Sequence, residues 1–225
     1  MSVLVSGCGI SFGKNTLPTW VKVLKLCNVP IDDQTGPGIT NDLICNLLIE
    51  NILQEKKHYT HAICQLTQFK KLDVELNKNN IPLMENDSLR NYQWRNYWPS
   101  SFSEDHVSKQ LYYKFLYSPT IEQKNLAIKL ILLEKICKEK NLPLLIILGT
   151  PLVLDDPLFQ KISHLNLNFN IIDDYKKSKY YKFHNTNQIS ITPNKYYQIY
   201  FADKINKDFL KFNINNKIKK FKNEP

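Results

Sequence analysis

The chain has 225 residues, of which 43% are apolar and 12% aromatic, a composition typical of a folded globular domain rather than of a disordered segment. No apolar run approaches the roughly 20 residues that a membrane-spanning helix needs, and the first residues lack the pattern of a secretion signal. The five cysteines are scattered, which argues against a disulfide framework or a structural zinc site. We therefore expect a cytoplasmic protein without metal, cofactor or membrane contact.

The formal charge of +9 comes almost entirely from lysine, because Arg90 and Arg95 are the only arginines among 30 basic residues. Lysine, asparagine and isoleucine are all abundant, as expected from an AT-rich coding sequence. The charge is therefore interpreted as a solvated lysine surface, and no nucleic-acid partner is expected. The basic segment Asn215–Pro225 is the exception, with contact to an acidic partner and a frayed end as the two open interpretations.

Strand and helix signals alternate along the chain. In the first half of the chain, the sequence predicts strands at Val3–Gly9, Val29–Ile31 and His61–Thr67, with helices at Leu17–Leu26 and after a Thr40 cap between them. In the second half, it predicts a helix at Ile121–Lys140, followed by strands at Pro143–Thr150 and Asn170–Asp173. A closing helix is predicted at Asn194–Phe212. This alternation implies βαβ units. We expect one α/β domain over residues 1–225, three-layer α/β/α with a doubly wound parallel sheet of about five strands.

Residues 74–119 interrupt this alternation. The stretch "RNYQWRNYWPSSFSEDHVSKQLYYKFLYSP" interleaves aromatic and polar residues without a clean period, and a long insertion of this kind is typical of a functional or interacting surface. Because lysine is the usual cation here, a retained arginine indicates a bidentate contact or stacking on tryptophan, with an internal salt bridge as the alternative. The expected contact residues for a protein partner, another copy of the chain or a viral assembly are Arg90, Trp94, Arg95 and Trp98.

The stretch "VLVSGCGISFGKNT" joins the first strand to a glycine-rich turn. In a doubly wound sheet, ligands bind at the carboxyl ends of the strands, so this turn lies at the expected site. A phosphate-binding P-loop is disfavoured, because Cys8 replaces its first glycine and Asn15 replaces its hydroxyl residue.

A dinucleotide fingerprint is a second interpretation of the turn. Gly7, Gly9 and Gly13 fit G-x-G-x-x-x-G, which has one residue more than the usual motif before its last glycine. Asp32 or Asp33 would then be the acid that binds the ribose. A nucleotide-binding enzyme stays open as a third-ranked function.

Four blocks, "LVSGCGISFG", "GPGITN", "HAICQLT" and "TPNKYYQIYFADKI", resemble the ordered blocks of the SGNH/GDSL hydrolase superfamily. The resemblance implies that fold, a nucleophilic serine in the first block, glycine and asparagine oxyanion donors, and an acid and a base before the last helix. The residues it suggests for oxyanion or ligand contacts are Gly9, Asn41, Gln65, Thr67 and Thr192.

The departures from this family pattern bear on the reaction. Gly9 stands at the nucleophile position and Thr192 at the base position, and neither residue can perform that step. The sequence therefore favours a binding or structural module without serine-esterase chemistry. The alternative is a hydrolase of esters or acetylated glycans that uses a displaced nucleophile, Ser11 or Cys8, with His184 as the base.

Three short blocks, "GCGIS", "KLDVE" and "YWPSS", are similar to uncharacterised sequences of viruses and bacteria. The similarity implies a virus-encoded protein of the virion or the host cytoplasm, and the AT-rich bias agrees with it.

Overall fold

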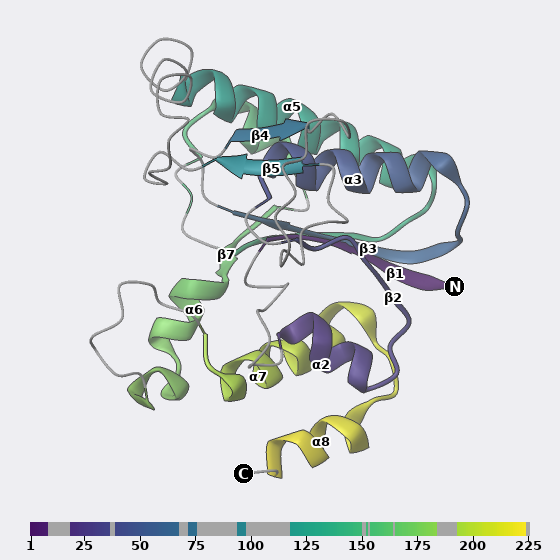
Figure 1. Cartoon of the computed structure of the whole chain (residues 1–225), viewed down its shortest axis with the longest axis vertical. Helices are drawn as coiled ribbons and strands as arrows, with labels where there is room; N and C mark the ends of the chain where they lie inside the picture. Colours follow the sequence, from purple (N-terminus) through teal and green to yellow (C-terminus); the bar gives the residue numbers. More distant parts are fainter. Residues whose placement is uncertain are drawn as a thin grey trace, which may run out of the picture.

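The computed structural model describes residues 1–8, 19–36, 39–67, 72–75, 94–97, 118–149, 152, 154–163, 165–183 and 193–223. Its centre is a parallel sheet of five strands in the order β2-β1-β3-β6-β7 (Figure 1). The strands are β1 (Ser2–Ser6), β2 (Ile31–Asp33), β3 (Tyr59–Leu66), β6 (Leu144–Leu148) and β7 (Leu165–Asn170). From β1 the chain first adds β2 on one side and then β3, β6 and β7 on the other. The predicted doubly wound parallel sheet is confirmed.

Helices cover both faces of this sheet (Figure 1). One face carries α3 (Asn41–Gln54) and α5 (Pro119–Glu139), and the other carries α2 (Trp20–Leu26), α7 (Lys195–Ile205) and α8 (Asn215–Asn223). The helix α6 (Ile171–Lys177) follows β7 directly. The three-layer α/β/α architecture is therefore as the sequence predicts.

The strands supply side chains to two separate hydrophobic cores. Leu4 packs with the residues of α3 and α5, whereas its neighbours Val3 and Val5 pack with the residues of α2 and α7. In β3, Cys64 and Ile63 divide in the same way. This alternation follows from the period of two along a strand, and it explains why these strands appear as continuous apolar runs in the sequence.

Side-chain caps fix where the helices begin. Thr40 accepts a hydrogen bond from the backbone N–H of Leu43, as the sequence predicts for the start of α3. Ser118 caps α5, in which Pro119 takes the first helical position. Thr19 caps α2 in the same way. Each cap bonds a backbone donor that would otherwise lack a partner within the helix.

The prediction of a strand at Asn170–Asp173 is wrong. The strand β7 ends at Asn170, whose side-chain oxygen accepts hydrogen bonds from the backbone of Ile172 and Asp173. These bonds cap α6, so the chain turns from strand to helix at a single residue. The short 3₁₀ helix η5 (Lys179–Phe183) follows.

The closing helix predicted at Asn194–Phe212 divides into two parts. Asn194 caps α7, which continues into a π-helical turn, η6 (Asn206–Leu210), and the helix stops where Lys211 adopts a left-handed conformation. The side chain of Asn206 then bonds both backbone groups of Phe212. After this turn, α8 packs Ile218 into the core beside α7.

The structure describes two short strands in this part of the chain, β4 (Leu72–Glu75), which begins just before the insertion and runs into it, and β5 (Trp94–Tyr97) inside it. They pair antiparallel, with Val74 opposite Arg95, and form a sheet separate from the central one. Elsewhere, a 3₁₀ helix, η4 (Pro157–Lys161), precedes β7. None of the helices in the described ranges combines the length and hydrophobicity needed to cross a bilayer.

Candidate functional site

The carboxyl ends of β1, β3 and β6 lie side by side, because the three strands are parallel neighbours. Cys8 follows β1, Gln65 and Thr67 lie at the end of β3, and Gly149 follows β6. Asn41, the first residue of α3, contacts the same edge through Thr67. Four of the predicted site residues, Cys8, Asn41, Gln65 and Thr67, are thus brought to one edge of the sheet.

Asn41 and Thr67 form a closed pair of hydrogen bonds. The Asn41 Nδ2 group donates to the Thr67 carbonyl at 2.8 Å, and the Thr67 backbone N–H donates to Asn41 Oδ1 at 2.7 Å. Both residues are buried. The carboxamide therefore bonds both backbone groups of Thr67, the residue that follows β3, and these two bonds fix the orientation of the carboxamide.

Gln65 connects three elements from a fully buried position. Its Nε2 group lies 3.8 Å from the Cys8 sulfur, and its Oε1 accepts the indole N–H of Trp20 at 3.0 Å. The backbone N–H of Trp20 donates in turn to the side-chain oxygen of Gln198 at 2.9 Å. Two glutamines thus hold the start of α2 between β3 and α7.

Gly149 is required by the close approach of this glutamine. A Cβ atom at position 149 would lie 2.7 Å from Gln65 Nε2 and 2.7 Å from the Leu66 carbonyl oxygen. The Gly149 backbone also donates to that carbonyl at 2.7 Å. The residue thus serves the packing of the edge, since any larger side chain would displace Gln65 or the end of β3.

The thiols in the core are buried and unpaired by disulfides. All five cysteines are free and buried. Burial raises the pKa of Cys137 to about 12, and the hydrogen bond with Cys45 together with burial raises the pKa of Cys64 well above its ordinary value. Cys8 keeps 4% of its surface exposed at the carboxyl edge.

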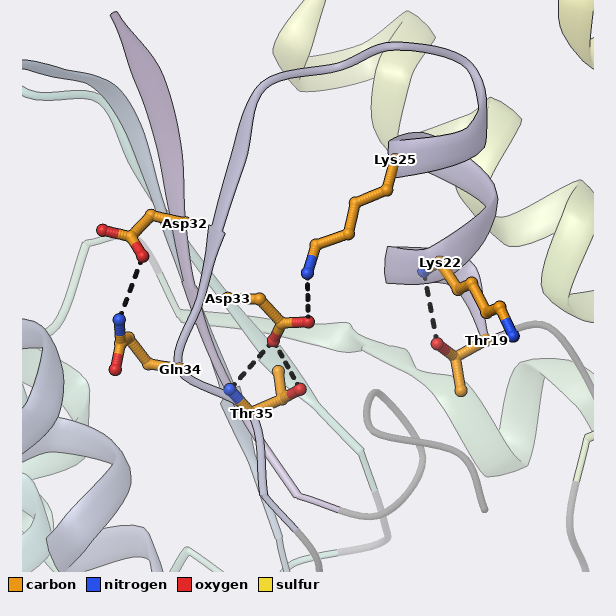
Figure 2. Close-up of polar contacts among 7 residues, drawn as sticks. All are labelled: Thr19, Lys22, Lys25, Asp32, Asp33, Gln34 and Thr35. Carbon is orange, nitrogen blue, oxygen red and sulfur yellow. Dashed lines mark hydrogen bonds and ion pairs between the residues drawn. The ribbon is translucent and has the colours of Figure 1, made fainter. Parts of the chain in front are cut away.

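A second polar network occupies the end of β2 (Figure 2). Asp33 accepts from Lys25 at 2.7 Å and from the backbone and hydroxyl of Thr35 at 2.9 and 2.5 Å. The pair with Lys25 joins α2 to β2, and Thr19 caps α2 beside it.

Asp32 makes a separate set of contacts. It accepts from Gln34 at 3.0 Å, from Lys57 at 2.9 Å and from the Tyr59 hydroxyl at 2.6 Å. Although burial opposes its ionisation, the hydrogen bonds from Tyr59 and Lys57 hold the pKa of Asp32 below its ordinary value. Both acids suggested for ribose binding are therefore engaged in contacts within the protein.

Several predicted site residues lie outside the described residues, namely Gly9, Ser11, Arg90, Trp98, His184 and Thr192. Trp94 and Arg95 belong to β5, whose backbone alone is described. Of the two described histidines, His61 lies near the amino end of β3, where its ring packs edge-on against Phe209 with 5.0 Å between centroids. Among the described residues, no histidine contacts Cys8.

Trp20 and Gln198 belong to the hydrogen-bond network around Gln65, and the sequence did not predict either of them. A buried glutamine on an apolar helix is a weak signal in a sequence, because nothing local indicates its partner. The described part of the chain holds no group of three or more histidine, cysteine, aspartate or glutamate side chains arranged to bind a metal ion.

No family model and no curated protein sequence matches the chain. Among solved structures, it is similar to the psychrotrophic esterase EstA from Pseudoalteromonas sp., in a structure inhibited by monoethylphosphonate. The two share 13% identity over 93% of this chain and 97% of that chain, with a TM-score of 0.49. At this level of similarity the comparison assigns no role to any residue, and the α/β/α fold itself rests on the sheet order described above.

Proposed function

We propose that this protein is an SGNH-hydrolase-like binding or structural module that has lost serine-esterase chemistry. This proposal rests on the observation that the polar side chains at the carboxyl edge form hydrogen bonds with one another or with the backbone. Asn41 is bonded to Thr67, and Gln65 bridges Cys8 and Trp20. Acyl transfer instead needs a nucleophile bonded to a base and donors directed at an open point between them. The described edge has the hydrogen-bonding pattern of a packed core.

A displaced-nucleophile hydrolase is the second candidate, and the position of Cys8 favours it. The Cys8 sulfur lies just after the end of β1 and accepts a hydrogen bond from the side-chain amide of Gln65. A reactive thiolate needs a nearby cation or helix N-terminus to lower its pKa. The described neighbour of Cys8 is a neutral carboxamide, so the binding-module proposal is preferred over a reaction through this thiol. The labelling experiment below tests a reaction through Ser11 with His184 as base.

Active-site labelling separates the two candidates. The folded protein is treated with a fluorophosphonate probe and, separately, with iodoacetamide, and modified residues are located by mass spectrometry. We expect no fluorophosphonate adduct and slow alkylation of Cys8, because its side chain is buried. Denatured protein, in which all five cysteines should react, is the control.

The opposite result is equally specific. Rapid labelling of Ser11 or Cys8 that is abolished by His184→Ala, together with hydrolysis of p-nitrophenyl acetate lost in the same variant, would establish the hydrolase. Loss of activity in Ser11→Ala or in Cys8→Ala then identifies the nucleophile.

The proposal includes a protein partner for the insertion at residues 74–119, another copy of the chain or a viral assembly. The pairing of β4 with β5 supports a protein partner. These two strands form a sheet separate from the central one, and an isolated two-stranded sheet is only marginally stable by itself. The short blocks similar to viral sequences support a place in the virion or the host cytoplasm. Sedimentation of the full chain and of a Trp98→Ala variant measures whether the insertion drives self-association.

A further inference from the structure

Charge is divided unevenly between the two helical layers. The layer formed by α2, α6, η5, α7 and α8, counted over residues 19–28, 170–181 and 193–219, carries eleven lysines and four aspartates, a net charge of +7. The opposite layer of α3, α5 and η4, counted over residues 41–58, 118–140 and 154–163, carries eight lysines and eight acidic residues and is neutral. The layers differ by three lysines and by four acidic residues, so a coding bias toward lysine does not account for most of this difference.

The helices α2, α6, α7 and α8 of the basic layer lie on the same side of the central sheet (Figure 1). These helices share one hydrophobic core, which includes Trp20 of α2, Tyr197 of α7 and Ile218 of α8. Tyr175 of α6 joins the same core, with its ring centroid 5.0 Å from that of Tyr197. The lysines therefore surround a single packed unit.

Within the described residues of this layer, eleven lysines face only four acidic residues. Nine of its eleven lysines are exposed. Lys25 pairs with Asp33 and Lys207 with Asp203, each within 2.9 Å. On the neutral layer, by contrast, Lys129 pairs with Asp42 and Lys140 with Glu55 across α3 and α5. A surface with this excess of one sign attracts polyanions at a distance.

The position of α8 argues against a bilayer as that polyanion. Its buried residue Ile218, together with Ile214 before it, faces the core, with 1% and 5% of their surfaces exposed. An amphipathic helix that binds membranes inserts its apolar face into the lipid, and here that face is already used inside the protein. Among the side chains of α8 that the structure describes, Asn216, Lys217 and Lys219 are exposed to a partner.

Exposed tyrosines accompany the lysines. Tyr181 of η5 and Tyr196 of α7 keep 37% and 44% of their surfaces exposed, in the segments "KSKYY" and "NKYY". Lysine contacts phosphate as a point charge without reading sequence, and an exposed aromatic ring is a surface on which unpaired bases stack. We propose that the basic layer binds single-stranded nucleic acid without sequence preference, through backbone contacts with its lysines and stacking on Tyr181 and Tyr196.

The proposal is tested on the full chain by fluorescence anisotropy with a labelled 20-nucleotide oligothymidine between 50 and 200 mM salt. We expect binding that weakens with salt, with a slope of log K against log salt of about −0.7 for each phosphate contact. The triple variant Lys211→Glu, Lys217→Glu, Lys219→Glu should bind at least about tenfold more weakly, because three contacts become repulsive.

The neutral layer offers a matched control. The variant Lys124→Glu, Lys135→Glu, Lys138→Glu changes the net charge of the protein by the same amount at exposed positions, and we expect its affinity to change by less than about threefold. Equal losses in the two triple variants would overturn the proposal, as would the absence of binding at 50 mM salt. Circular dichroism checks that both variants remain folded.

Two further measurements identify the partner class. Tyr196→Ala should weaken binding at least about fivefold while Tyr196→Phe preserves it, because stacking needs the ring and not the hydroxyl. Equal affinity for a duplex of the same length contradicts single-strand binding. Binding to phosphatidylserine vesicles that requires the same lysines, without binding to oligothymidine, overturns the proposal in favour of a membrane.

Discussion

Asn41 shows at the scale of one residue how a position expected to serve catalysis is used for the fold. The amide bonds both backbone groups of Thr67 from a buried position at the start of α3. A carboxamide can supply one acceptor to the N–H and one donor to the C=O of the same residue, which a carboxylate cannot do. The identity of this residue is therefore explained without a ligand.

Replacement of Asn41 by aspartate tests this explanation. In Asn41→Asp, a carboxylate oxygen faces the Thr67 carbonyl in place of the N–H donor, so we expect unfolding to be easier by about 2 kcal/mol or more. Urea denaturation at pH 7 measures the change. Asn46→Asp, on the same helix but in part-exposed contact with Lys129, is the matched control and should change stability by about 0.5 kcal/mol or less. A stable Asn41→Asp variant would contradict the structural role.

Sequence and structure agree that some residues lie at the carboxyl edge of the sheet, whereas other residues of this edge were not predicted. Asn41, Gln65 and Thr67 were predictable, because the carboxyl ends of parallel strands meet at one edge. Trp20 and Gln198 were not, since their hydrogen bonds link positions 45 and 178 residues apart. No local pattern records such a pairing, which exists only after the sheet and its helices are assembled.

At the scale of elements, β7 shows where pattern reading fails. Its sequence "LNLNFN" alternates strictly between apolar and polar residues, which is a strand signal, yet asparagine is disfavoured in strands. The apolar pair Ile171–Ile172 after it therefore favours a strand at Asn170–Asp173 instead. The structure uses Asn170 as a helix cap, so that these isoleucines begin α6 and are buried by it.

The C-terminal helix α8 is an element whose contribution to stability can be measured. Ile218 is 1% exposed and packs in the core with α7. We expect Ile218→Ala to lower the free energy of unfolding by about 2–4 kcal/mol, because it removes a buried side chain and leaves a cavity. Lys217→Ala, on the exposed side of the same helix, should change it by about 0.5 kcal/mol or less. Thermal and urea unfolding give both values, and equal effects would show that α8 does not dock.

At the scale of the whole molecule, the alternation of elements predicted the doubly wound sheet, whereas the partition of charge could not be predicted. Which helices share a face depends on the order β2-β1-β3-β6-β7, because the crossover helices on either side of the reversal cover opposite faces. Lysine-rich segments near both ends of the chain, in α2 and α8, meet in one layer only through that order.

Stability of the whole molecule should also depend on pH through His61. Burial against Phe209 and Phe212 lowers the pKa of this imidazole below 6.5, so the folded state binds a proton less readily than the unfolded state. The contribution of neutral His61 to the free energy of unfolding is therefore fully present above pH 6.5, and it is lost as the pH falls through the lower pKa that His61 has in the folded protein. We expect the urea midpoint to decrease between pH 7 and pH 5, and to decrease less in His61→Leu, which keeps an apolar contact with the two rings. A variant with the same pH dependence as the wild type would show that His61 is not the group responsible.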